Sequence, residues 1–302
     1  SRMDIVHLNI DYGIGEQLKF VKGKGGLPFI SIKNQSATAL ISLHGGQILS
    51  FTPIKVEEDL FFLSSKSYYS DGKAIRGGVP VCWPWFGSDP KGLQRPNHGF
   101  VRSHLWTVLS TATTDTETKV SLQFLERYKK EKTWRQPFAL TLEITIGTTL
   151  GLKLITRNTG DKPFSITQAF HSYFHVGDID QVQVSGLEGR NYFDKLDQGA
   201  EKSQTSTLTP SVEIDRIYTD VKNELMINDP VFKRKIQISS PNNETVVVWN
   251  PGLKTSRTIA DLKNKAYKQF ICVETGNIAF DLIHIPADAE HSLLTTFEIL
   301  PH

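Results

Sequence analysis

The sequence has little cysteine, no long apolar run and no marked excess of charge of either sign. Only two cysteines, Cys82 and Cys272, occur in 302 residues. They are too few for a disulfide framework, and they lack the spacing of a metal site. A reducing compartment is therefore expected.

No apolar run is long enough to cross a bilayer, and the first residues, SRMDIVHLNIDYG, lack the apolar core of a signal peptide. These two absences predict a cytoplasmic protein without a membrane partner. Lys and Arg total 34 and Asp and Glu total 32, which gives a net charge of +2. A balance this close to neutral gives no support for nucleic acid as a partner.

The residues that are present have the proportions of a soluble globular protein, with 39% hydrophobic and 22% charged side chains. A chain of this length can bury most of its apolar surface without disulfides. It could form one large domain or two, but no repeat, low-complexity tract or linker-like segment divides it. We expect a single domain, residues 1–302, that is a monomer or a weak homo-oligomer.

The strongest periodicity is two residues, which is the spacing of a half-buried strand. Apolar side chains alternate through residues 138–146 and again through 150–154, so these segments predict a hairpin that turns near 147–149. Further strands are expected near residues 120, 182, 235, 245, 269 and 294, separated by turn-forming residues. The pattern predicts an all-β protein, folded as a large antiparallel β-sandwich.

One stretch, ITQAFHSYFHVGD (166–178), has an unusual polar face. If it is a strand, its side chains alternate between two faces. One face is mostly apolar and resembles ordinary core. The other carries three titratable rings, those of His171, Tyr173 and His175.

Four more stretches combine reactive residue types with turn-forming residues. They are AIRGGVPVCWPWFG (74–87), RPNHGFVRSHLW (95–106), EIDRIY (213–218) and FICVETGN (270–277). His98 and Arg102 are four residues apart, so they share a face if their segment is extended. Glu274 ends an apolar strand abruptly.

Each of these residues has an ordinary structural explanation when it is taken alone. A strand histidine is usually satisfied or half exposed, Arg76 can pair with a surface carboxylate, and Trp83 and Trp85 can fill a core. Together they are more informative. An imidazole and a carboxylate can supply one proton donor and one acceptor at neutral pH, and two arginines can hold a phosphate or a carboxylate. Aromatic side chains near a turn offer flat faces on which a sugar ring can stack.

The sequence contains no Gly-rich phosphate loop, no nucleophile elbow and no helix motif with metal-ligand spacing. The residues therefore predict proton transfer on a small anionic polyol, with neither a cofactor nor a metal.

Five ordered motifs are similar to those of one enzyme family. IRGGVPVCWPWFG, NHGFVRSHLW, QAFHSYFHVGD, EIDRIY, and VWNPG with FICVETGN resemble the glucose-6-phosphate 1-epimerases, which are hexose-6-phosphate mutarotases of the aldose 1-epimerase superfamily. The resemblance covers nearly the whole chain. It implies a β-sandwich of the galactose mutarotase type, with the substrate in a cleft on a concave sheet. It also implies an isomerase that interconverts the α and β anomers of a hexose 6-phosphate, with glucose 6-phosphate as the first candidate.

The resemblance further implies roles for individual residues. His171 looks like the general acid of the family, and Glu274 looks like the general base. Arg76 and Arg102 are similar to the phosphate-binding arginines. Contacts with the sugar are implied for three more residues, His98, Asp215 and Trp249.

The residues alone leave four alternatives open. A mutarotase for unphosphorylated aldoses would not need two arginines. A glycosidase would use Asp215 and Glu274 as its two carboxylates and would give His171 no necessary part. A carbohydrate-binding or regulatory protein without catalysis could use the same fold. A metal site could use His98, His171 and His175.

Overall fold

Antiparallel sheets form most of the regular structure. The computed structural model describes residues 4–124, 134–222 and 224–302. Within these ranges the α-helices are Ile5–Tyr12 (α1) and Gly252–Ser256 (α2), and none is long and apolar enough to cross a membrane. Short 3₁₀ helices are η1 (Lys24–Gly26), η2 (Val101–Ser103), η4 (Ile179–Gln181), η5 (Lys195–Asp197) and η6 (Ala266–Gln269). The predicted all-β class is confirmed.

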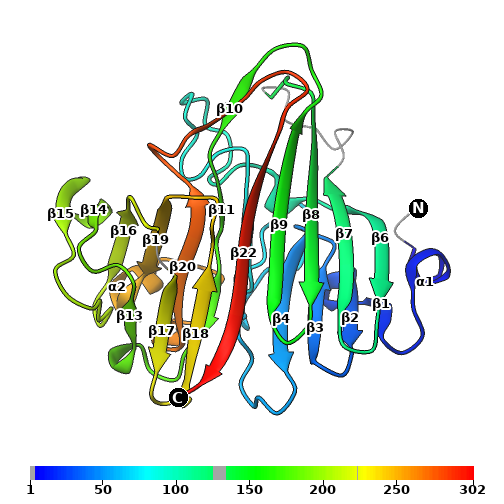
Figure 1. The fold of residues 1–302 in the computed structure, drawn as a ribbon, viewed down its shortest axis with the longest axis horizontal. Helices are drawn as coiled ribbons and strands as arrows, with labels where there is room; N and C mark the ends of the chain where they lie inside the picture. Colours follow the sequence, from blue (N-terminus) through cyan, green and yellow to red (C-terminus); the bar gives the residue numbers. More distant parts are fainter. Residues whose placement is uncertain (1–3, 125–133, 223) are drawn as a thin grey trace.

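One long antiparallel sheet crosses the view of Figure 1 from β13 on the left to β6 on the right. In spatial order its strands are β13 (Gln183–Ser185), β17 (Leu225–Asp229), β18 (Arg234–Ser239), β22 (Glu290–Pro301), β9 (Leu150–Asn158), β8 (Phe138–Ile146), β7 (Thr118–Phe124) and β6 (Thr107–Thr113). The predicted hairpin is confirmed, because β8 pairs with β9 along its whole length and Gly147 N donates to Thr149 O (3.0 Å).

The opposite layer consists of two sheets. The first contains β1 (Leu18–Lys22), β2 (Pro28–Lys33), β3 (Ala37–Ser42) and β4 (Gln47–Pro53). The second runs in the order β15 (Ala200–Ser203), β14 (Asn191–Asp194), β16 (Ile214–Tyr218), β19 (Thr245–Asn250), β20 (Phe270–Asn277), β11 (Gln168–Phe170) and β5 (Val81–Cys82), and β12 (Tyr173–His175) also pairs with β20. A separate two-stranded ribbon joins β10 (Phe164–Ile166) to β21 (Ile283–Ile285).

The layers enclose one large cluster of buried apolar side chains. Ile30 and Ile41 enter it from the four-stranded sheet, Leu142 from the long sheet, and Val248 and Val273 from the second eight-stranded sheet. This arrangement confirms the predicted sandwich. It also means that one face of β19 and β20 is committed to the core, which leaves the opposite face for other contacts.

The other expected strands are present as β7, β13, β18, β19, β20 and β22. Residues 125–128, at the end of the strand expected near 120, lie outside the described residues. Two strands are longer than expected, since β20 continues past Glu274 to Asn277 and β22 begins at Glu290.

The stretch 166–178 is not the continuous strand that its alternation predicts, because the strand assignment is interrupted between β11 and β12. Pro80 lies across from this point. His171 N donates to Pro80 O (2.9 Å), but a proline has no N–H to return the bond, so the ladder is broken there. The alternation itself survives, since Phe170 and Phe174 enter the main core whereas His171 and Tyr173 face the other side.

The segment around His98 also differs from expectation. It is not extended, because His98 has a φ of 63° and η2 follows it. The argument that an extended segment places His98 and Arg102 on one face is therefore wrong, although a turn brings both side chains to the same cavity.

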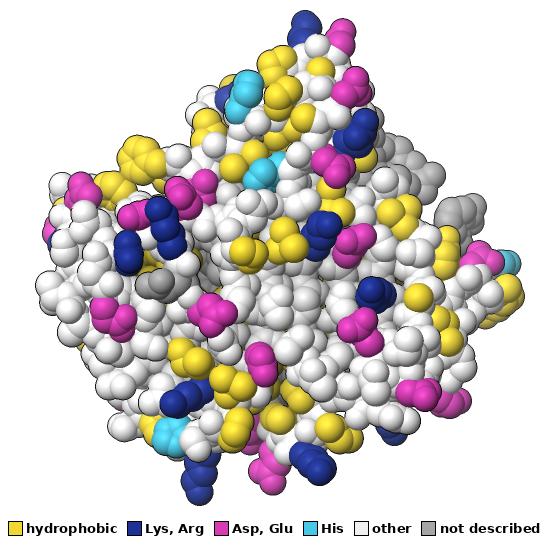
Figure 2. Space-filling model, in the orientation of Figure 1, with side chains coloured by type: hydrophobic (Ala, Val, Ile, Leu, Met, Phe, Trp, Pro, Cys, Tyr) yellow, Lys and Arg dark blue, Asp and Glu magenta, His cyan; other side chains and the backbone are white. Residues whose placement is uncertain are grey.

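The face of the molecule seen in Figure 2 carries Lys and Arg side chains interspersed with Asp and Glu. No broad area of one sign appears on this face, as expected from a net charge of +2.

Candidate functional site

The face of the second eight-stranded sheet that points away from the main core carries the polar residues. Asp215 on β16 lies directly opposite Trp249 on β19. Val247, two residues before Trp249, lies directly opposite Glu274 on β20. Because opposed residues point to the same face of a sheet, these four side chains lie together.

Glu274 and His171 form a buried pair on this face. The strand pairs on either side of His171 keep one register, which places His171 across from Glu274. Nε2 of His171 is 3.5 Å from Oε1 of Glu274, and the side chains are only 9% and 1% exposed. Oε1 of Glu274 and Nδ1 of His171 have no hydrogen-bond partner among the described residues. The pair is therefore close, buried and not saturated by neighbouring groups.

Burial moves the pKa values of both groups toward their uncharged forms. Burial, followed by the negative charge of Asp215, raises the pKa of Glu274 well above its usual range. Burial, followed by the positive charge of Arg102, lowers the pKa of His171 to about 3. Both shifts favour the uncharged forms, so a proton held by the pair is favoured on Glu274 over His171. The expectation of an ionised Glu274 and a protonated His171 stays a prediction, and burial opposes both charges.

His98 presents a defined hydrogen-bond donor beside this pair. Its Nδ1 accepts a hydrogen bond from Gly87 N (2.8 Å), so the neutral ring carries its proton on Nε2. Burial, with His171 and Arg102, lowers the pKa of His98 and keeps the ring neutral. The rings of His98 and His171 stand edge to face with centroids 5.4 Å apart.

Two arginines approach the site from outside the sheet, Arg76 from a loop and Arg102 from η2. Arg76 is held on two sides, because its Nε donates to Asp261 Oδ1 (2.8 Å) and one terminal nitrogen donates to the hydroxyl of Tyr173 (3.0 Å). Arg102 follows the turn at His98, and its terminal nitrogen donates to Asn97 O (3.3 Å). Both guanidinium groups can still offer donors to an anion.

These side chains line one cavity of about 370 Å³. All seven residues expected from the sequence lie on its wall: Arg76, His98, Arg102, His171, Asp215, Trp249 and Glu274. A second cavity of about 230 Å³ adjoins it and shares Arg76, Arg102 and Tyr173. The site thus combines a buried acid/base pair, a neutral donor and two cations around a space that suits a small polar molecule.

The sequence did not reveal three contributors. Lys195, at the start of η5, lines the cavity, as does Asn97. Asp261 orients Arg76 from a loop 185 residues further along the chain. Asn97 belongs to the NHGFVRSHLW motif but was not singled out within it. No motif or periodicity marks Lys195 or Asp261, since a lysine after a strand and an aspartate in a loop are usually solvated.

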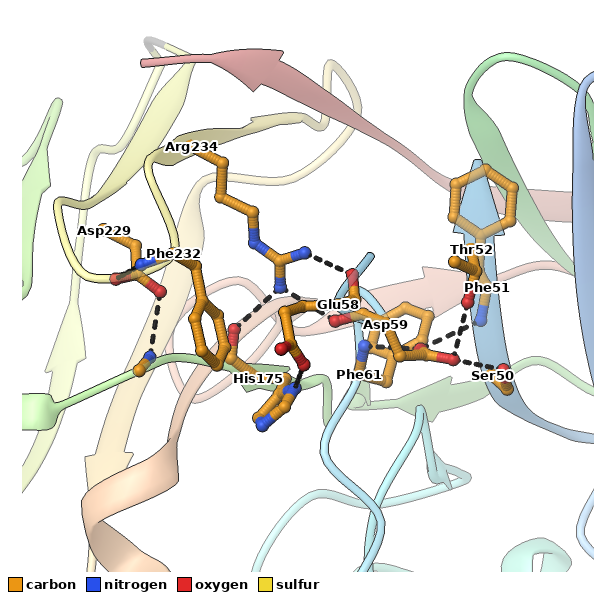
Figure 3. Close-up of polar contacts among 11 residues, drawn as sticks. Ser50, Phe51, Thr52, Glu58, Asp59, Phe61, His175, Asp229, Phe232 and Arg234 are labelled. Carbon is orange, nitrogen blue, oxygen red and sulfur yellow. Dashed lines mark hydrogen bonds and ion pairs between the residues drawn. The ribbon is translucent and has the colours of Figure 1, made fainter. Parts of the chain in front are cut away.

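His175 lies outside the cavity, in the separate cluster drawn in Figure 3. Its Nδ1 is 4.0 Å from Glu58 Oε2, and its ring stands 4.8 Å, centroid to centroid, from Phe232. Arg234 ties this cluster together by donating to the carbonyl oxygens of Glu58, Asp59 and His175. The suggested metal site of three histidines is therefore wrong, because among the described residues His175 is not grouped with the other two.

Comparison with known proteins identifies the family of the chain. Residues 28–298 match the family described as aldose 1-epimerase. The chain belongs to the aldose 1-epimerase family. A curated relative from Escherichia coli K12, named "putative glucose-6-phosphate 1-epimerase", is 35% identical to this family member over 252 residues, which are 83% of each chain.

Solved structures share the fold. The crystal structure of a "putative mutarotase" from Salmonella typhimurium is similar to this aldose 1-epimerase family member with a TM-score of 0.88 and 29% identity, over 99% of this chain and 100% of the other. A galactose mutarotase-like protein from Clostridium acetobutylicum shares the fold, with a TM-score of 0.72 and 13% identity over 94% and 98% of the two chains. The expected galactose mutarotase-like fold is confirmed.

Proposed function

We propose that this protein interconverts the α and β anomers of hexose 6-phosphates, with glucose 6-phosphate as the first candidate. The observation that carries the proposal is the buried Glu274–His171 pair on the floor of a cavity whose wall also holds two arginines. The curated relatives named as glucose-6-phosphate 1-epimerases support the phosphorylated substrate.

The reaction needs two proton transfers and no change of oxidation state. A base removes the proton of the C1 hydroxyl while an acid gives a proton to the ring oxygen O5, so the C1–O5 bond breaks and an aldehyde forms. Rotation about C1–C2 exposes the other face of the aldehyde, and the reverse transfers close the ring. Each positioned transfer typically contributes about 10²–10⁴-fold to the rate.

We assign the base role to Glu274 and the acid role to His171. A proton held by the buried pair is favoured on Glu274, so these roles require its transfer to His171. Transfer of that proton from Oε1 to Nε2, across 3.5 Å, produces the carboxylate and the imidazolium. The total charge of the pair does not change, so no proton from solvent is required.

The remaining residues would bind and orient the sugar. Arg76 and Arg102 can hold the 6-phosphate through charge-assisted hydrogen bonds. His98 can donate from Nε2 to a ring or hydroxyl oxygen, and Asp215 can accept from a hydroxyl. Trp249 offers an apolar face for the ring. Such fixed contacts speed the reaction only if they hold C1 and O5 close to the reacting geometry.

Exchange spectroscopy by NMR tests this function directly. The purified protein should accelerate α/β exchange of glucose 6-phosphate well above the buffer rate, and more effectively than exchange of free glucose. Galactose and mannose 6-phosphates define the preferred hexose. Greater efficiency with the free sugars would favour a mutarotase for unphosphorylated aldoses. Tight binding of glucose 6-phosphate without faster exchange would favour a non-catalytic sugar-phosphate-binding protein.

A further inference from the structure

A third buried side chain accompanies the acid/base pair. Cys272 is two residues before Glu274 on β20 and therefore shares its face, next to His171. One potential ligand atom from each of these three residues lies within 4.8 Å of the others, and all three residues are buried. Within the described part of the chain, no other trio of His, Cys, Asp or Glu side chains is grouped in this way.

The distances suit a small tetrahedral cation. Nε2 of His171 and Oε1 of Glu274 are 3.5 Å apart. Two nitrogen or oxygen ligands that bind one tetrahedral zinc ion at about 2.0–2.1 Å lie about 3.4 Å from each other. Glu274 is buried, with only 1% of the residue exposed. Its Oε1 accepts no hydrogen bond from the described residues, so a lone pair of this atom remains for a ligand.

We propose that His171, Cys272 and Glu274 form a binding site for Zn²⁺, and that the ion inhibits the enzyme. Imidazole, thiolate and carboxylate together match the ligand preference of zinc, whereas calcium and magnesium prefer oxygen ligands alone. Three protein ligands leave the fourth position open toward the cavity. Inhibition follows because the ion uses Nε2 and Oε1, the same atoms that pass protons, and this consequence rests on the proposed function.

The surroundings make the binding reversible. Binding displaces the protons of the Cys272 thiol and the Glu274 carboxyl to solvent, against burial, which raises the pKa of both groups. The resulting thiolate and carboxylate together neutralise the charge of the ion, but Arg102 and Lys195 line the same cavity and repel it. Cys272 is fully buried, so the ion reaches it from the cavity side, past Glu274 and His171. Closing the widest ligand separation from 4.8 Å toward tetrahedral geometry requires side-chain shifts of about 1 Å.

Cobalt(II) provides a probe of the site that does not depend on activity. Addition of Co²⁺ to the purified protein should produce the near-ultraviolet thiolate-to-cobalt charge-transfer band. Cys272→Ala should lose this band, and Cys272→Ser, which conserves the side-chain volume, should lose it as well. Cys82→Ala is the matched control, because Cys82 is equally buried but is not part of the group, and it should keep the band.

Inhibition is then measured by anomer exchange, with each variant compared with its own rate in the absence of metal. The inhibition constant for Zn²⁺ should rise at least about tenfold in Cys272→Ala, since even groups that only support a ligand typically contribute 10–100-fold to metal affinity. Cys82→Ala should be inhibited like the wild type. Absence of the cobalt band from the wild type, or its persistence in both Cys272 variants, overturns the metal site. A cobalt band in a protein that never accelerates exchange would instead overturn the proposed function and leave the site standing.

Discussion

At the scale of the residue, Arg76 and Arg102 enter the cavity with different degrees of freedom. Arg76 is fixed by Asp261 and Tyr173 at 2.8 and 3.0 Å. Arg102 makes a single long hydrogen bond, of 3.3 Å to Asn97 O, within the described residues. The N–H donors of Arg102 are therefore more available than those of Arg76, and we assign to Arg102 the larger part in recognising the phosphate.

Arg102→Ala should therefore raise the KM for glucose 6-phosphate about 10- to 100-fold, as expected for the loss of hydrogen bonds to a charged group. The KM for free glucose should change little, which makes the unphosphorylated sugar the internal control. Steady-state kinetics with both sugars measure the two effects. Equal increases would show that Arg102 does not read the phosphate.

At the same scale, sequence reasoning identified some residues of the site and missed others. Motifs that combine rare residue types, such as His98 in NHGF and Glu274 in VETG, led to side chains that do line the cavity. Lys195 and Asp261 stayed hidden because their roles depend on which loops meet in space. The effect of burial on the pair, which opposes the charges of both groups, also could not be read from a motif.

At the scale of the element, β11 and β20 lie unusually close together beside the Glu274–His171 pair. A Cβ on Gly276 of β20 would lie 2.3 Å from Gln168 O and 2.7 Å from the Cβ of Ala169, both on β11. Only glycine lets β11 approach this closely, and β11 leads directly into His171. The spacing between these strands therefore helps to position the acid/base pair.

Gly276→Ala should destabilise the protein by about 1–3 kcal/mol, the usual cost of overpacking, and should also slow anomer exchange because β11 is displaced. Gly151→Ala on β9 is the matched control. Its new Cβ would meet Thr145 at an ordinary 3.7 Å, so a neutral or slightly stabilising effect is expected. Denaturant unfolding and exchange rates measure both variants. Equal stability of the two would contradict the close-approach argument.

The elements that were predicted well are those whose pairing is uninterrupted. The hairpin of β8 and β9 has strict alternation and a turn, and it formed as expected. The stretch 166–178 has the same alternation, but its neighbour across the ladder is Pro80, which a single-strand pattern cannot show. The boundaries of a strand depend on the strands that pair with it. The face that a side chain occupies depends only on the local two-residue period, so this part of the prediction was confirmed.

At the scale of the whole molecule, the buried carboxyl group links stability to pH. Burial raises the pKa of Glu274 in the folded state, so the folded protein keeps a proton that the unfolded chain releases above about pH 4.3. The unfolded state then binds fewer protons, and the free energy of unfolding falls as the pH rises through this window. The site thus costs stability at neutral and alkaline pH.

Glu274→Gln should remove this cost, so its stability relative to the wild type should increase between pH 5 and pH 8. Denaturant titrations at both pH values provide the measurement. Glu143→Gln is the control, because Glu143 is exposed on β8 and its replacement should have the same effect at both pH values. If the gain in unfolding free energy of Glu274→Gln over the wild type stayed constant or shrank from pH 5 to pH 8, Glu274 would ionise normally in the folded protein.

The single-domain organisation of residues 1–302 stays a prediction, although the main apolar cluster draws side chains from Leu8 to Phe297. The mixed charges on the face seen in Figure 2 contrast with the cavity, whose wall brings Arg76, Arg102 and Glu274 together.

The most direct measurement is α/β exchange of glucose 6-phosphate, followed by NMR, in His171→Ala and Glu274→Gln. Each variant should be at least ~100-fold slower than the wild type, with the fold verified by circular dichroism. His175→Ala, which removes a neighbouring imidazole outside the cavity, should exchange at close to the wild-type rate. Near-native exchange by folded His171→Ala and Glu274→Gln would contradict the account, because the pair would then take no part in moving protons.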